Sequence, residues 1–102
     1  MHLVQILLPL SNNNGKKFSG KKFASVRKHL LDQYGGVTIY NRSPATGLWE
    51  DSDNELAADR VIIFEVMVTA IEINWWKQYR AKLEKQFQQD EIVIRSIAIE
   101  QM

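Results

Sequence analysis

One carboxylate lies in the middle of the most apolar segment of the chain. The segment reads RVIIFEVMV over residues 60–68, and Glu65 is its only acidic residue. A carboxylate in such surroundings needs a partner, must be neutral, or must face a pocket. Arg95 lies in a second apolar segment, EIVIRSIAI, and its guanidinium fork suits a carboxylate. The two side chains are the first candidates for chemistry.

Gln5 lies in a third apolar segment, LVQILL, again near its middle. We expect Gln5, Glu65 and Arg95 to form one polar row across a sheet, with Glu65 paired to Arg95. Tyr40 or Thr38 would extend the row. In one interpretation the row is a buried ion pair that fixes the register of an oligomer interface. In the other it is a small-molecule pocket, in which Arg95 holds an anionic group and Glu65 could act as a base.

Six segments with strand-like or helix-like patterns would position these side chains. The predicted strands cover residues 3–8, 37–41, 60–68 and 91–99, and the predicted helices cover 19–34 and 69–88. This order predicts an α+β domain of the ferredoxin-like β-α-β-β-α-β type. Its four-stranded antiparallel sheet has the order 4-1-3-2, both helices lie on one face, and residues 1–102 form a single domain.

The other face of this sheet would be open and unusually apolar. Alternation directs Leu3, Leu7, Ile63, Met67 and Ile97 to it, together with the polar row. A contiguous apolar sheet face marks an interaction surface. We therefore expect the protein to partner itself as a homo-oligomer, such as a face-to-face dimer.

Local signals mark the ends of the helices. Ser19 is a good N-cap for the first helix, and Gly35 is a typical left-handed stop. Thr69 and Glu72 have the spacing of a capping box, which predicts that the second helix begins at Thr69. Lys22 belongs to a lysine cluster that is either a solvated face or an anion site at the first helix.

Composition excludes several classes of function. The 102 residues include 13 Lys and Arg, 12 Asp and Glu, and no Cys. This charge balance does not suggest a nucleic-acid partner, and no apolar run is long enough for a membrane span. His2 and His29 lack metal-ligand spacing, and no nucleotide motif is present, so we expect no metal and no cofactor. Without a signal peptide, we expect a cytoplasmic protein.

Four segments resemble a family of small uncharacterised bacterial proteins. They are GGVTIYNRSPATGLWE, VIIFEVMV, WWKQYRAKLEKQF and EIVIRSIAI, beginning at residues 35, 61, 75 and 91. The resemblance implies a ferredoxin-like domain. More loosely, the architecture is similar to dimeric α+β barrel proteins, some of which are cofactor-independent monooxygenases. It directs attention to Arg42 and Trp49, which flank the Pro44 turn; alternatively, Arg42 pairs with an acid and Trp49 covers a sheet edge.

The sequence therefore predicts a small homo-oligomeric binding or regulatory module for a small anionic ligand. The ligand-binding candidates are Gln5, Tyr40, Arg42, Trp49, Glu65 and Arg95. The first alternative is a cofactor-independent enzyme of the monooxygenase or isomerase type, with Glu65 as its base. The second is a purely structural interaction protein.

Overall fold

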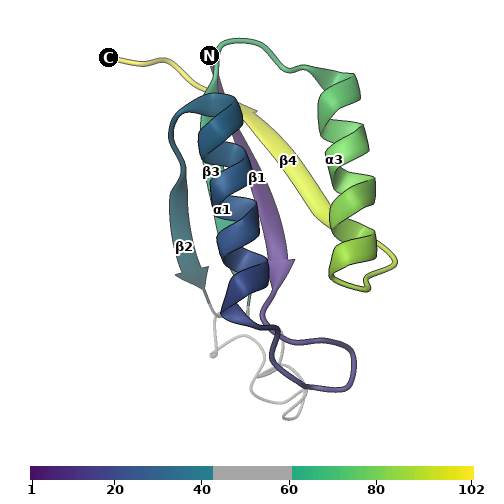
Figure 1. Ribbon diagram of the computed structural model, residues 1–102. Coiled ribbons are helices and arrows are strands. Elements are labelled where there is room, and N and C mark those ends of the chain that lie inside the picture. The colour runs from purple at the N-terminus through teal and green to yellow at the C-terminus, as the bar shows by residue number, and fades with distance from the viewer. Residues whose placement is uncertain (43–60) are drawn as a thin grey trace, which may run out of the picture.

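The computed structural model describes residues 1–42 and 61–102, which form a four-stranded antiparallel sheet and two helices (Figure 1). The protein is therefore α+β, as predicted. In chain order the elements are β1 (His2–Pro9), α1 (Gly20–Tyr34), β2 (Thr38–Arg42), β3 (Val61–Val68), α3 (Ile73–Gln86) and β4 (Val93–Ala98). The strands lie within two residues of their predicted ends. Arg60, predicted to open the third strand, falls outside the described residues.

The strand order in the sheet is β2-β3-β1-β4. Read from the β4 edge, this is 4-1-3-2, so β1 and β3 occupy the centre. All three pairings are antiparallel. The register places Gln5 opposite Glu65 on one side and opposite Arg95 on the other. Thr38 on β2 lies opposite Glu65.

Both helices cover the same face of the sheet (Figure 1). Alternate residues of the central strands point to that face, because successive strand side chains project to opposite sides. They form one core with the apolar stripes of the helices. Its members include Val4, Ile6, Leu8, Val26, Leu30, Phe64, Val66, Val68, Trp76, Tyr79, Leu83, Phe87 and Ile92.

The first helix begins and ends where its local signals predict. Ser19 has an extended backbone at the N-cap position, although its side chain makes no capping hydrogen bond. Gly35 ends the helix with φ of 80°, and its N–H donates to the Leu31 carbonyl at 2.8 Å. This is the left-handed conformation that glycine adopts without a Cβ penalty.

The predicted start of the second helix at Thr69 is wrong. α3 begins at Ile73, Glu72 occupies the N-cap position, and neither end of the proposed capping box makes a side-chain cap. Figure 1 shows the reason: the chain leaves β3 in the middle of the sheet and must cross to the β4 side before α3 begins. An extended segment spans about 3.3 Å per residue, whereas a helix advances only about 1.5 Å. The crossing distance therefore overrides the local capping signal.

Lys22 ties the start of α1 to the end of α3. Its Nζ donates to the Gln86 carbonyl at 2.6 Å, and it lies 5.2 Å and 5.7 Å from the ring centroids of Phe18 and Phe87. The carbonyl groups at a helix C-terminus lack intrahelical donors, and the face of an aromatic ring attracts a cation. Lys22 thus has a structural role in this fold.

Candidate functional site

The sheet face opposite the helices carries large apolar side chains exposed to solvent. Met67 and Ile97 are each 47% exposed, and Val93 is 46% exposed. Leu3 and Leu7 on the central strand β1 are only partly buried. This open face therefore has the apolar character expected from the alternation of the strands.

A chain of hydrogen bonds crosses the middle of the open face. Arg95 Nε donates to Gln5 Oε1 at 2.8 Å, and Gln5 Nε2 donates to Glu65 Oε2 at 2.7 Å. Tyr40 OH donates to Glu65 Oε1 at 3.3 Å, which makes it the weakest link. We call these four residues the polar row. The row was predicted from the sequence, with Tyr40 rather than Thr38 supplying the bond from β2.

The predicted direct pair between Glu65 and Arg95 is wrong. β1 lies between β3 and β4, so the two side chains are separated by two strand spacings of about 4.8 Å each. Gln5 occupies the intervening position and makes a hydrogen bond to each charged group. Its carbonyl accepts from the cation and its amide donates to the anion, so the two charges fix which way the amide points.

The row leaves binding capacity at its β4 end. Arg95 is exposed, and within the described residues only its Nε makes a hydrogen bond. Its two terminal nitrogens retain the donors that bind a carboxylate or phosphate in a fork. Glu65 has fewer unused hydrogen-bonding positions than Arg95, because each of its oxygens already accepts one hydrogen bond. The arrangement can therefore hold an anion at Arg95 beside apolar side chains.

An aromatic cluster that the sequence analysis missed joins the two helices. His29 stacks on Tyr79 with ring centroids 4.6 Å apart and on Trp75 at 5.6 Å. Tyr34 stacks on Trp76 at 5.4 Å. Trp75 on α3 thus lies at the contact with α1. The signal in the sequence was the set of aromatic residues on the two helices, but their pairing depends on how the helices cross.

Two candidate residues cannot be placed beside the row. Trp49 and the turn around Pro44 lie outside the described residues, as does the Arg42 side chain, although the Arg42 backbone ends β2. The register brings Gln5, Glu65 and Arg95 together, and the Tyr40 hydroxyl reaches Glu65 from β2. Four of the six candidate residues therefore lie side by side on the open face, and their role as a binding site stays a prediction.

Neither a search for membrane helices and metal ligands nor a comparison with known proteins identifies a function for this chain. Of the described helices, neither is long and apolar enough to cross a membrane. No group of three or more potential metal ligands occurs in residues 1–42 and 61–102. The chain matched no protein-family model, no curated protein and no solved structure.

Proposed function

We propose that the protein is a small cytoplasmic binding or regulatory module that works as a homo-oligomer and takes a small anionic ligand on the open face of its sheet. The observation that carries this proposal is the polar row with the unused terminal nitrogens of Arg95 at its end. In the bound state, the Arg95 guanidinium contacts the anion. Gln5 and Glu65 hold that guanidinium in place.

The surroundings of the row support a ligand that is partly apolar. Val93 and Ile97 flank Arg95 two residues away on the same strand, so their side chains project to the same face. Both are exposed in the single chain. Binding sites for small molecules commonly combine an apolar wall with a few polar groups that fix orientation.

The same exposed residues support self-association. Monomeric soluble proteins rarely leave a contiguous apolar patch of this kind uncovered. A second copy covering the face would remove Met67, Val93 and Ile97 from water and enclose the row. We also propose that the fold is ferredoxin-like, since the order of elements, the sheet order and the placement of both helices agree with that arrangement. The family resemblance noted above stays a prediction.

The contacts of Glu65 support a positioning role in a binding site. A catalytic base must reach a substrate proton with a free lone pair in suitable geometry. Both oxygens of Glu65 accept hydrogen bonds from neighbours on the sheet. These bonds use two of about four lone-pair sites of the carboxylate. They hold Gln5 and Tyr40 in the row, and this positioning role is the one that the contacts of Glu65 support.

An NMR titration tests ligand binding at the row. Benzoate, an apolar anion, should shift the Arg95 Nε–H and Gln5 side-chain amide resonances, and benzamide, its neutral isostere, should not. Arg95→Gln should abolish the benzoate response of the Gln5 amide. Arg27→Gln, which removes an exposed cation from α1, should retain it. Equal shifts with benzoate and benzamide, or none with either, would contradict anion binding at this site.

Light scattering tests the oligomer. The wild type should have the mass of a defined oligomer, and Ile97→Glu should reduce it to the mass of the single chain, because a carboxylate would be buried without a partner. Arg27→Glu serves as the control for adding a carboxylate away from the open face. A monomeric wild type at micromolar concentration would refute self-association and leave the titration result unaffected.

A further inference from the structure

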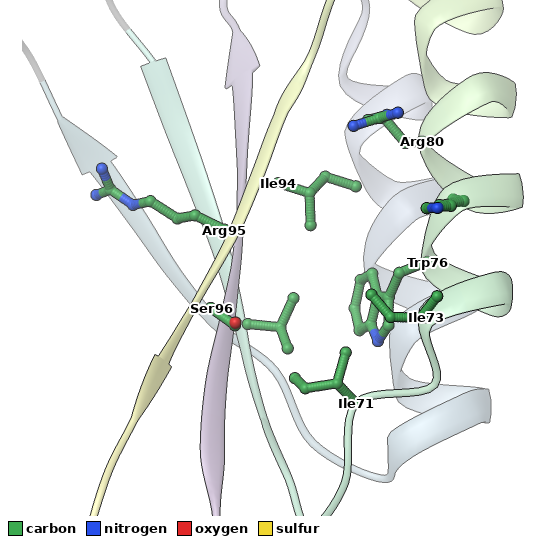
Figure 2. A pocket seen from close by; sticks show the side chains of 9 residues that line it. Ile71, Ile73, Trp76, Arg80, Ile94, Arg95 and Ser96 are labelled. Atoms are coloured by element: carbon green, nitrogen blue, oxygen red, sulfur yellow. The ribbon is translucent and has the colours of Figure 1, made fainter.

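A half-enclosed cavity of about 160 Å³ lies on the helix-covered side of the sheet, between β4 and α3. Figure 2 shows Ile94 pointing from β4 towards α3, with Trp76, Ile73 and Ile71 facing it. Arg95 projects to the opposite side of the strand in the same view, although its residue borders the cavity. The cavity is therefore distinct from the polar row and does not depend on the function proposed above.

The cavity exists because β4 carries a small side chain where α3 begins. Ile92, just before β4, is buried in the core with Leu83 of α3 and with Phe87, which follows the end of α3. Two positions beyond Ile94, the helix-facing residue is Ser96, which is too short to fill the same space. The gap thus opens beside the N-terminal half of α3.

The charges around this cavity have one sign. Lys77 and Arg80 of α3 line it, and no Asp or Glu is among the described residues that do. Arg80 Nε is 3.9 Å from Glu84 Oε2, beyond hydrogen-bond distance, and that oxygen already accepts from the Ile92 backbone N–H. The Arg80 guanidinium, which projects from α3 towards β4 in Figure 2, therefore makes only a long ion pair with Glu84 and keeps its hydrogen-bond donors for another anion.

The floor of the cavity is apolar and buried. Val4 is 2% exposed and Trp76 is 5% exposed, while Ile73 at the rim is 56% exposed. An apolar cavity of about 150 Å³ stays dry and is large enough for benzene. The space over this apolar floor is thus large enough for an apolar group of that size.

We propose that this cavity binds a small amphipathic carboxylate, with an apolar body of up to about six carbons between β4 and α3. The carboxylate of this ligand faces Lys77 and Arg80 at the rim. The apolar body contacts Trp76, Ile94 and Ile71. A short-chain fatty acid has this chemistry, since it combines one anionic head with an unbranched apolar tail.

The indole N–H of Trp76 provides a direct readout. It is buried and has no hydrogen-bond partner among the described residues. The chain has three Trp residues, so three indole resonances are expected in a ¹H–¹⁵N spectrum, and Trp49→Phe and Trp75→Phe assign the third to Trp76. Ligand in the cavity should shift the Trp76 signal in a saturable way.

A series of straight-chain carboxylic acids of increasing length tests the size of ligand that the cavity accepts. Affinity should increase about fourfold per methylene from acetate through butyrate to hexanoate, as expected for burial of each CH₂. It should then level off at decanoate, because the cavity is full. Hexan-1-ol should bind about fivefold more weakly than hexanoate, the order of magnitude for loss of partly exposed ion pairs.

Two variants separate the charge from the cavity. Replacing Lys77 and Arg80 together by Gln should reduce hexanoate affinity to that of hexan-1-ol, and replacing Arg27 and Lys82 by Gln should not. Ser96→Leu, which fills the cavity from an exposed position on an edge strand, should abolish the Trp76 shift while the melting temperature is retained.

Three results would overturn the proposal. They are the absence of a Trp76 shift with hexanoate, equal affinity for hexanoate and hexan-1-ol, and an unchanged shift in folded Ser96→Leu. None of them bears on benzoate binding at Arg95, which is read from different resonances on the other face.

Discussion

Gln5→Met tests whether the polar row stabilises the fold or only lies on it. Met matches the length of Gln but makes no comparable hydrogen bond, so the variant removes the bonds to both Arg95 and Glu65 without removing the side chain. The two bonds are 2.8 Å and 2.7 Å long, and each involves a charged group. They are the shortest links in the row.

The size of the effect follows from burial. A hydrogen bond to a charged group contributes about 1.5–3 kcal/mol in a protein interior, and an exposed ionic contact contributes less than about 1 kcal/mol. Glu65 and Gln5 are half-buried, and Arg95 is exposed. We therefore expect Gln5→Met to reduce the free energy of unfolding by about 1.5 kcal/mol, most of it from the bond to Glu65. The melting temperature should fall by about 6–12 °C.

Denaturant unfolding, measured at two protein concentrations, would give this value. Gln33→Met on the exposed side of α1 is the matched control and should change stability by less than about 0.5 kcal/mol. A double-mutant cycle with Arg95→Met should give a coupling of about 0.5 kcal/mol. If Gln5→Met equals its control and the cycle shows no coupling, the row does not stabilise the sheet, and our reading of its geometry is refuted.

Three other perturbations have defined outcomes. Lys22→Met should cost about 1 kcal/mol by calorimetry, because it removes the bond to the end of α3 and the contact with two rings. Gly35→Ala should cost about 1 kcal/mol, since its φ is 80°, whereas Gly36→Ala should be nearly neutral. Burial, reinforced by the charge of Glu72, raises the pKa of Tyr34 from 10.0 to about 12. The folded state then favours the neutral phenol, so stability should fall as pH rises from 10 to 12, and Tyr34→Phe should weaken that fall.

Each of these predictions has a control. Lys21→Met should have little effect, because Lys21 is exposed. Similar losses for Gly35→Ala and Gly36→Ala would contradict the backbone argument, since a Cβ meets nothing within 4 Å at either position. At neutral pH, Tyr34→Phe should change stability little, because the buried hydroxyl lies near the Trp76 and Glu72 side chains without a well-formed hydrogen bond to either.

The parts of the fold that sequence could predict are those that depend on local signals. α1 follows a regular apolar stripe and ends at a glycine that needs a left-handed backbone. The strands follow from their alternation. The start of α3 could not be predicted in the same way, because the distance from β3 to the far side of the sheet decides it, and the local Thr69–Glu72 pattern carries no information about that distance.

In the candidate site, too, the features set by local sequence could be predicted and those set by contacts between distant segments could not. Alternation was sufficient to place Gln5, Glu65 and Arg95 on one face, and the predicted strand order already put the strand of Gln5 between the other two. The error was to pair Glu65 with Arg95 by charge alone, although Gln5 on the intervening strand lies between them and makes a hydrogen bond to each. The cavity beside α3 was missed because it results from a mismatch between Ser96 and a helix distant in sequence.

Both proposed sites depend on one register. β1 pairs with β4 so that Gln5 lies opposite Arg95 and Val4 lies opposite Ser96. A shift of one residue in β4 would turn Arg95 towards α3 and Ile94 towards the open face, because strand side chains alternate. The Gln5–Arg95 bond and the burial of Ile92 both oppose that shift. The polar row therefore helps to define the cavity on the other face through the backbone of β4, even though no side chain of the row enters it.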